Sequence, residues 1–252
     1  QESINLEAEK TKHYEYAKAK LKKIKNSASK IELLLKKRDN TEKYKLYGDL
    51  LTANLYKKSD FQDSITIFDY INEKNIIIEL DKTKTLTENA QQYYKLYTKS
   101  KSTKERSTKL LEELNIEKEY FENICYSIER AGNLSELSEI STELGLNLKN
   151  SLKFKDKETK PITKELNGYK IYIGKNNKQN DYIVSKLAKD DDYWFHTHLT
   201  PGSHVLLKTY GSEPDENTIY ECCKLAREYS SAQMPSKVGV IYTKAINLRK
   251  PP

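Results

Sequence analysis

A long segment without proline, with its apolar residues at helical spacing, constrains the fold of this chain most. From residue 12 to about residue 57 the sequence contains no proline. Within this segment the apolar residues recur at spacings of three and four, at Leu21, Ile24, Ala28, Ile31 and Leu35. This spacing places them on one face of an α-helix, as in the seam of a coiled coil. The segment is therefore predicted to form one helix of about 46 residues, roughly 70 Å long.

A second segment, from about residue 88 to residue 130, shows similar periodicity and is predicted to pack antiparallel against the first helix. Its apolar positions are Tyr93, Tyr97, Leu110, Leu114, Phe121, Ile124 and Ile128. Between the two helices, residues 64–71 and 75–80 alternate at period two, which is typical of β-strands. The sequence thus predicts a coiled-coil arm with a small β-hairpin at its tip, at about residues 64–80.

After Gly132 the pattern changes and predicts a second domain. Leu134, Leu137, Ile140 and Leu144 indicate one more helix, so that the arm and its return helix occupy residues 1–149. The polar, lysine-rich residues 150–164 are predicted to be a linker. Residues 165–252 then alternate short elements and predict a compact domain, which makes the whole chain α+β. The expected strands are 169–173, 192–197, 203–208 and 238–242, and the expected helices are 180–188 and 219–232.

Composition and charge are consistent with a helical arm followed by a compact domain. Only 37% of the residues are hydrophobic and 32% are charged, which is little core material for one globule. The net charge of +7 slightly favours an anionic partner. Long cations flank the seam of the first helix, at Lys22, Lys23, Lys36, Lys37 and Arg38. They indicate either an arm that contacts RNA or a structural spacer whose lysines keep it solvated.

Cysteine content and hydropathy indicate an intracellular protein. The three cysteines, Cys125, Cys222 and Cys223, have no disulfide-framework spacing. No stretch approaches the roughly 20 apolar residues of a membrane span. The sequence opens on Gln1, already within a helical pattern, so we expect the natural N-terminus to lie further upstream.

The turn that begins at Gly174 offers one candidate binding site. Gly174 is predicted to take a positive φ, so that Lys175, Asn176 and Asn177 turn tightly and, with Lys178, offer donors to phosphate or base edges. The alternative is an ordinary strand-to-helix turn in which an asparagine caps the following helix. Three further cations, beside a predicted edge strand, suggest a phosphate-contacting rim: Lys244, Arg249 and Lys250.

The segment around Trp194 offers a second candidate. Trp194 and His196 differ by two positions, so on a strand they share one face, where their rings and that of His204 could stack on unpaired bases. The alternative places Trp194 in the core. The histidines and cysteines lack zinc-site spacing, which favours structural histidines. Ser203 and His204 would point to opposite strand faces, so no hydrolytic pair is expected. Neither catalysis nor a metal or other cofactor is predicted.

Two blocks of sequence resemble the NFACT family, which includes RqcH, NEMF and bacterial fibronectin-binding protein A-like proteins. Residues 168–181 (GYKIYIGKNNKQND), Trp194-Phe195-His196 and the run from Pro201 to Val205 (PGSHV) resemble the NFACT RNA-binding domain. Residues 47–54 (YGDLLTAN), 80–81 (LD) and 88–95 (ENAQQYYK) resemble segments of the family's coiled-coil middle region. The chain departs from the pattern at His198 and Leu199, and at the cysteines of an otherwise Ala-rich helix.

The resemblance implies a non-enzymatic, cytoplasmic fragment of a ribosome-associated quality control factor. The intact protein would bind large ribosomal subunits that carry stalled peptidyl-tRNA, and would recruit alanyl tRNA for C-terminal alanine tailing. The RNA-binding domain would hold the turn, the aromatic cluster and the C-terminal cations, while the arm contacts the ribosome. The family's N-terminal domain lies outside this sequence, and a further C-terminal strand is expected beyond it. The alternatives are a surface adhesin for fibronectin or fibrinogen and a scaffold that dimerises through the arm.

Overall fold

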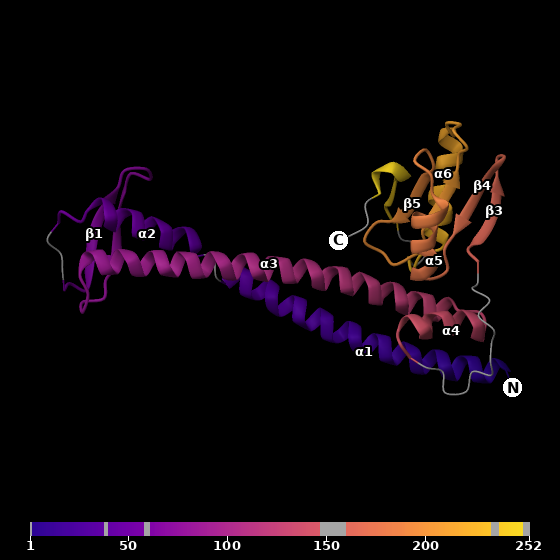
Figure 1. The fold of residues 1–252 in the computed structure, drawn as a ribbon, viewed down its shortest axis with the longest axis horizontal. Helices are drawn as coiled ribbons and strands as arrows, with labels where there is room; N and C mark the ends of the chain where they lie inside the picture. The colour runs from indigo at the N-terminus through magenta and orange to yellow at the C-terminus, as the bar shows by residue number, and fades with distance from the viewer. Residues whose placement is uncertain (1, 38–39, 58–60, 147–159, 233–236, 249–252) are drawn as a thin grey trace. The chain divides into compact units, whose positions relative to one another are not determined.

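The computed structural model describes residues 2–37, 40–57, 61–146, 160–232 and 237–248. The protein is α+β, with a long helical region followed by a β-sheet domain, as Figure 1 shows. It divides into two compact units. We call Lys25–Asn115 the hairpin unit, and Gln1–Ile24 together with Ile116–Pro252 the sheet unit. The predicted fold class is therefore confirmed, whereas antiparallel coiled-coil pairing stays a prediction.

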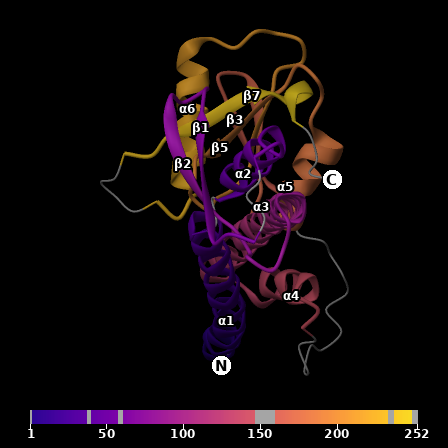
Figure 2. The ribbon, with the colours of Figure 1, turned by 90° about the vertical axis from the view of Figure 1, so that its left-hand side faces the viewer.

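The hairpin unit contains the predicted β-hairpin. Strands β1 (Ser64–Asp69) and β2 (Lys74–Glu79) pair antiparallel, and Figure 2 shows them side by side. One face of the hairpin packs on helix α2 (Thr41–Ala53) and on the start of α3 (Leu86–Arg130). The buried residues of this core are Leu51, Ile65, Ile67, Ile78, Leu86 and Ala90. Alternate burial along β1 is what a strand with one covered face requires.

The prediction of one uninterrupted helix to about residue 57 is wrong. Helix α1 (Glu2–Lys37) ends before α2, whose N-cap is Asn40. The side chain of Thr41 turns inward and bonds to Ser100 on α3, with 2.7 Å between the two hydroxyl oxygens. Asparagine and threonine favour helix starts over helix interiors because their side chains compete for backbone hydrogen bonds. The second long helix is confirmed, since α3 spans the predicted range.

At the start of α3, hydrogen bonds join the Leu80-Asp81 and Glu88-Asn89 segments. Thr85 and Glu88 form a capping box, in which the Glu88 carboxylate accepts from the Thr85 backbone N–H at 2.8 Å. The Asn89 side chain accepts from the Asp81 backbone N–H at 2.7 Å and donates back to the Asp81 carbonyl at 3.1 Å. These bonds anchor the segment after β2 to the first turn of α3.

Helical segments form one part of the sheet unit. The predicted helix after Gly132 is α4 (Leu134–Glu143), whose N-cap Asn133 accepts from the Glu136 backbone N–H at 2.9 Å. It packs against the N-terminal part of α1 and the C-terminal part of α3. The buried residues at this junction are Ala17, Ile124, Ile128, Ala131, Leu137 and Ile140. The helical part contacts the β-sheet domain, since Asn123 on α3 accepts a hydrogen bond from the Gly202 backbone N–H at 3.1 Å.

The sheet has the strand order β3-β4-β6-β5-β7, and every neighbouring pair is antiparallel. Its strands are β3 (Ile162–Leu166), β4 (Tyr169–Ile173), β5 (Tyr193–Thr197), β6 (Val205–Lys208) and β7 (Val240–Lys244). The last four lie at or within two residues of the predicted strands. β3 begins inside the predicted linker 150–164, of which residues 150–159 lie outside the described residues. Asn167 and Gly168 join β3 to β4, both with positive φ, as tight hairpin turns require.

Helices cover the two faces of the sheet. Helix α6 (Glu216–Glu228) packs Cys222 and Ala226 against Ile171, Phe195 and Val205. The opposite face carries α5 (Asn177–Tyr182) and the π-helical turn η1 (Ile183–Leu187). The predicted helices 180–188 and 219–232 correspond to α5 with η1 and to α6. Figure 1 shows α5 and α6 on the sheet domain.

Candidate nucleic-acid interface

Gly174 does not take the positive φ that the sequence suggested. Among the glycines of the described ranges, Gly145, Gly168 and Gly211 do. Gly174 is required for a different reason, since a Cβ added there would lie 2.1 Å from Asn180 Oδ1. That oxygen accepts from the His204 backbone N–H at 3.0 Å. The glycine therefore permits a close approach between the turn and α5.

The capping alternative for this turn is confirmed. Asn176 is the N-cap of α5, with extended backbone (φ −152, ψ 173), and its side chain accepts from the Gln179 backbone N–H at 2.9 Å. The Gln179 side chain in turn accepts from the Lys175 backbone N–H at 3.1 Å. Reciprocal bonds of this kind stabilise the first turn of a helix. The backbone donors of the turn are thus partly used within the protein.

Side chains of the same turn bind an acidic face of α4. Lys175 Nζ lies 2.7 Å from Glu136 Oε1, Asn176 Nδ2 donates to Glu139 at 2.9 Å, and Asn177 Nδ2 donates to Glu143 at 3.2 Å. The three glutamates occupy one helix face, at positions i, i+3 and i+7. Three groups that were predicted to contact RNA therefore already have carboxylate partners, and RNA binding at them would require an exchange of partners.

The pKa values of two of these carboxyls are perturbed. At Glu136, burial raises the pKa, but the hydrogen bonds from Lys175 and from the Gly132 backbone together outweigh it and lower the net pKa. At Glu143, burial dominates and raises the pKa, although bonds from Tyr120 and Asn177 oppose it. Of these two carboxyls, Glu136, which lies opposite Lys175, is therefore the more firmly ionised.

Trp194, His196 and His204 lie together, as predicted, and their rings contact one another. Trp194 stacks on His196, with 5.8 Å between ring centroids and 18° between planes, and His204 meets both rings edge-on. Burial lowers the pKa of His196, and lowers that of His204 to about 3. The cluster is therefore neutral at pH 7. Because its rings already pack against each other, stacking on an RNA base stays a prediction.

The structure describes four further cations that were predicted to contact RNA, Lys22, Lys23, Lys36 and Lys244. Lys244, on the edge strand β7, pairs with Glu213 at 3.1 Å. Lys22, Lys23 and Lys36 on α1 are exposed. The Lys37 side chain, Arg38, Arg249 and Lys250 lie outside the described residues.

Metal and thiol chemistry find little support in the described ranges. No group of three or more His, Cys, Asp or Glu side chains there is arranged to hold a metal ion. Burial raises the pKa of Cys222 to about 12, which keeps its thiol protonated. Nor does any described helix have the length and apolar character needed to span a bilayer.

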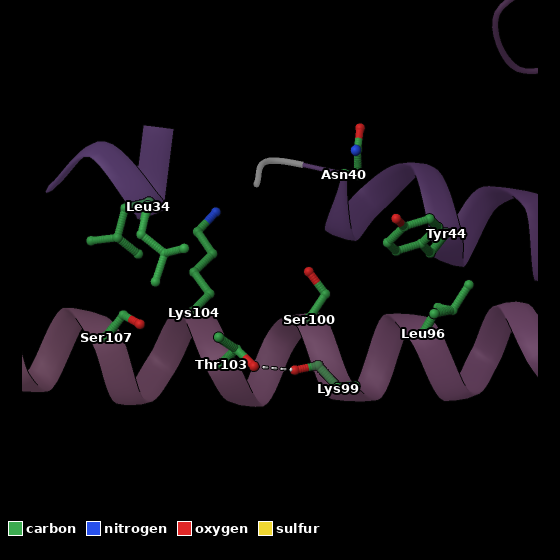
Figure 3. Close-up of a pocket in the computed structure, with 10 residues that line it drawn as sticks. Leu34, Asn40, Tyr44, Leu96, Lys99, Ser100, Thr103, Lys104 and Ser107 are labelled. Atoms are coloured by element: carbon green, nitrogen blue, oxygen red, sulfur yellow. Dashed lines mark hydrogen bonds between the residues drawn. The ribbon is translucent and has the colours of Figure 1, made fainter. Parts of the chain in front are cut away.

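Three cavities were not predicted. One of about 270 Å³ lies in the hairpin unit at the break between α1 and α2, where Leu34, Tyr44 and Leu96 line it (Figure 3). One of about 280 Å³ lies beside Lys175, between α3, α4 and the sheet. The largest, of about 460 Å³, lies between the sheet and α5 with η1. Only Lys178 among its lining residues was predicted, although Lys178, Tyr182 and Lys186 share a spacing of four.

Comparisons with known proteins agree with these features. The family described as "NFACT N-terminal and middle domains" matches residues 1–164, and "NFACT protein RNA binding domain" matches residues 160–252. The chain is 38% identical to the Rqc2 homolog RqcH of Bacillus subtilis (strain 168), over 91% of this chain and 42% of that protein. It is 30% identical to the Rqc2 homolog RqcH of Streptococcus pneumoniae serotype 2, over 97% and 46%.

A solved structure extends the comparison to the fold. The C-terminal part of the fibronectin/fibrinogen-binding protein from Streptococcus suis superposes with a TM-score of 0.72 at 25% identity, covering 98% of this chain and 87% of that one. The chain spans less than half the length of the two relatives above. Both family descriptions together cover the sequence from end to end, so this chain belongs to the NFACT family and residues 160–252 are its RNA-binding domain.

Proposed function

We propose that the chain is part of a ribosome-associated quality control factor, and that it binds the large ribosomal subunit and tRNA. The observation that carries this proposal is the match of residues 160–252 to the NFACT RNA-binding domain, together with the similarity to RqcH. In the intact cytoplasmic protein, these contacts recruit alanyl tRNA to subunits that hold stalled peptidyl-tRNA. The chain itself is not an enzyme, and the ribosome forms each peptide bond of the alanine tail.

Exposed lysines on α1 support the ribosome-binding part of this proposal. Lys22 and Lys23 in the sheet unit are exposed, as is Lys36 in the hairpin unit. Cations with access to solvent can neutralise phosphates and release counterions, which is the main source of affinity for a polynucleotide. Lys175, Asn176 and Asn177 in the turn after Gly174 are less suited to binding phosphates, because they already bind glutamates of α4. We therefore assign the first contacts with ribosomal RNA to the arm.

Purification of the intact protein from cells tests the proposal. Free large subunits with tRNA are expected to copurify, and the yield is expected to fall steeply as salt is raised. A Lys22→Gln, Lys23→Gln double variant should recover fewer subunits than the wild-type protein. Absence of subunits from the purified wild-type protein would overturn the proposal, and recovery by the double variant equal to that of the wild type would remove Lys22 and Lys23 from the interface.

The similarity to the Streptococcus suis protein favours a second candidate function, binding of fibronectin or fibrinogen. Immobilised fibronectin and fibrinogen separate the two candidates. Saturable binding that resists added salt, with no recovery of ribosomal subunits from cells, would favour the adhesin. Light scattering would identify a scaffold, because such a protein would be a dimer in the absence of RNA.

A further inference from the structure

The largest of the three cavities lies on the face of the sheet that α6 leaves uncovered. Tyr172 on β4 lines it, between Ile171 and Ile173, which are fully buried on the α6 side. Side chains alternate between the two faces of a strand, so Tyr172 projects to the opposite face. Tyr182, the last residue of α5, also lines the cavity and is 47% exposed. The cavity therefore has one aromatic ring from the sheet and one from α5.

Three lysines line the same cavity. Lys178 and Lys186 lie four residues before and after Tyr182, and Lys160 precedes β3; all three are exposed and line the cavity. Two carboxylates also line it. One of them, Glu139, accepts from Asn176 Nδ2 at 2.9 Å, so part of its hydrogen-bonding capacity is used within the protein. The lining thus combines tyrosines with an excess of positive charge.

The backbone of η1, which forms part of the cavity lining, is unusual. Residues Ile183–Leu187 form a π-helical turn, in which the Ala188 backbone N–H donates to the Ile183 carbonyl at 2.9 Å. Its residues Ser185, Lys186 and Leu187 all line the cavity. Such turns are rare and occur frequently at functional sites. The π-turn therefore shapes the wall that presents Lys186.

We propose that this cavity binds one unpaired nucleotide of RNA, with the base against Tyr172 and Tyr182 and the flanking phosphates against Lys178 and Lys186. This inference rests on the proposed function, and it names the site within the RNA-binding domain. A volume of about 460 Å³ falls within the range of small-ligand sites and accommodates a nucleotide. Aromatic rings bind unstacked bases of single strands, whereas the bases of a duplex are stacked within the helix and cannot enter.

Binding of a fluorescein-labelled RNA hexanucleotide to the 252-residue chain tests the proposal. Tyr182→Ala is expected to weaken binding roughly five- to 150-fold, the range for loss of one base-stacking ring, whereas Tyr182→Phe should retain most of the affinity. The matched control is Tyr220→Ala. Tyr220 is 59% exposed on α6, on the other face of the sheet, beside Lys224. Its removal should leave the affinity unchanged.

A charge variant tests the phosphate contacts. Lys178→Gln with Lys186→Gln should reduce the slope of log K against log salt by about 1.4, since each phosphate contact with a single strand contributes about 0.7. Lys224→Gln with Lys237→Gln removes equal charge elsewhere and should leave that slope unchanged. A hexanucleotide with one 4-thiouridine, irradiated at long wavelength, should crosslink to the peptide that contains Tyr182.

The outcomes separate this site from the function on which it rests. If the chain binds the hexanucleotide but Tyr182→Ala and Tyr220→Ala bind it equally well, the cavity is not the site, although RNA binding stands. If the chain binds no hexanucleotide while the intact protein still copurifies with large subunits, the cavity is overturned and the proposed function is not. If the chain binds no hexanucleotide and the intact protein does not copurify with large subunits, both the cavity site and the proposed function are overturned. Circular dichroism of each variant excludes unfolding as the cause of weaker binding.

Discussion

Lys208 and Asp192 form a buried ion pair inside the sheet domain, which no local sequence pattern predicted. Lys208 Nζ contacts Asp192 and also donates to the Leu187 carbonyl at 2.9 Å. The Asp192 carboxylate accepts further bonds from the backbone N–H groups of Thr209 and Lys189, at 3.0 and 2.8 Å. Every charged group of this cluster is thus paired, which a buried charge requires.

Removal of Lys208 alone should therefore be costly. We expect Lys208→Met to lower the free energy of unfolding by about 3–5 kcal/mol, because it leaves the buried Asp192 carboxylate without its counterion. Urea denaturation, followed by the fluorescence of Trp194, measures this change. The double variant Lys208→Met, Asp192→Leu should lose less than the single one, since it removes both charges. A single variant as stable as the wild type would contradict the buried pair.

The two histidines of the aromatic cluster make stability depend on pH. Burial lowers the pKa of His204 in the folded protein to about 3, against 6.5 for the ordinary side chain, and lowers that of His196 as well. Below pH 6.5 the unfolded chain binds protons that the folded chain does not. The stabilisation is therefore complete above pH 6.5 and is lost progressively as the pH falls from 6.5 towards 3.

Denaturation at a series of pH values tests this dependence. The free energy of unfolding should fall by up to about 1.4 kcal/mol per pH unit for each unprotonated histidine, below pH 6.5. His204→Phe should flatten the curve, because one titrating group is removed. A wild-type curve that is flat between pH 7.5 and pH 5 would contradict the neutral, buried cluster.

At the scale of elements, the contact between α4 and the turn before α5 decides what Lys175 does. Its ammonium is partly buried against Glu136, on a helix that the sequence assigned to the arm. The sequence identified both elements correctly but not their contact, because the two residues are 39 positions apart. Likewise, β3 was missed although Asn167-Gly168 is a strong hairpin signal, since its flanking lysines suggested a linker.

Two substitutions distinguish a structural from an RNA-binding Lys175. We expect Lys175→Gln to lower the free energy of unfolding by about 1 kcal/mol, through loss of a partly buried ion pair, with little change in RNA affinity. Lys178→Gln, at an exposed position, should reduce RNA affinity, with a smaller loss of stability than Lys175→Gln. Thermal denaturation and hexanucleotide titration measure the two quantities. The reverse pattern would restore Lys175 to the RNA interface.

At the scale of the whole molecule, the two compact units have separate hydrophobic cores. Leu51, Ile67 and Ile78 belong to the core of the hairpin unit, whereas Ile171 and Phe195 belong to that of the sheet. The single tryptophan, Trp194, lies in the sheet unit and reports on it alone. The two units should therefore unfold as distinct cooperative transitions.

A core substitution in the hairpin unit tests this separation. Leu51 is fully buried, and Leu51→Ala should destabilise the hairpin unit by about 2–5 kcal/mol. The helical signal in circular dichroism should then show an earlier transition, while the transition of Trp194 fluorescence stays in place. Ile171→Ala, in the core of the sheet unit, is the converse control, and should move the transition of Trp194 fluorescence to milder conditions. Equal shifts of both signals for Leu51→Ala would indicate one cooperative molecule.

Local patterns along the chain were enough to predict most elements and the family. The period of apolar residues located α3 and α4, alternation located β1, β2 and β4, and the GKNN and PGSHV motifs identified the RNA-binding domain, because these signals depend on near neighbours. Long-range packing decided the rest. It gave Lys175, Asn176 and Asn177 carboxylate partners on α4, gave Gly174 its role beside Asn180, and formed the tyrosine-lined cavity. Those contacts join residues far apart in the chain, so no local period or spacing encodes them.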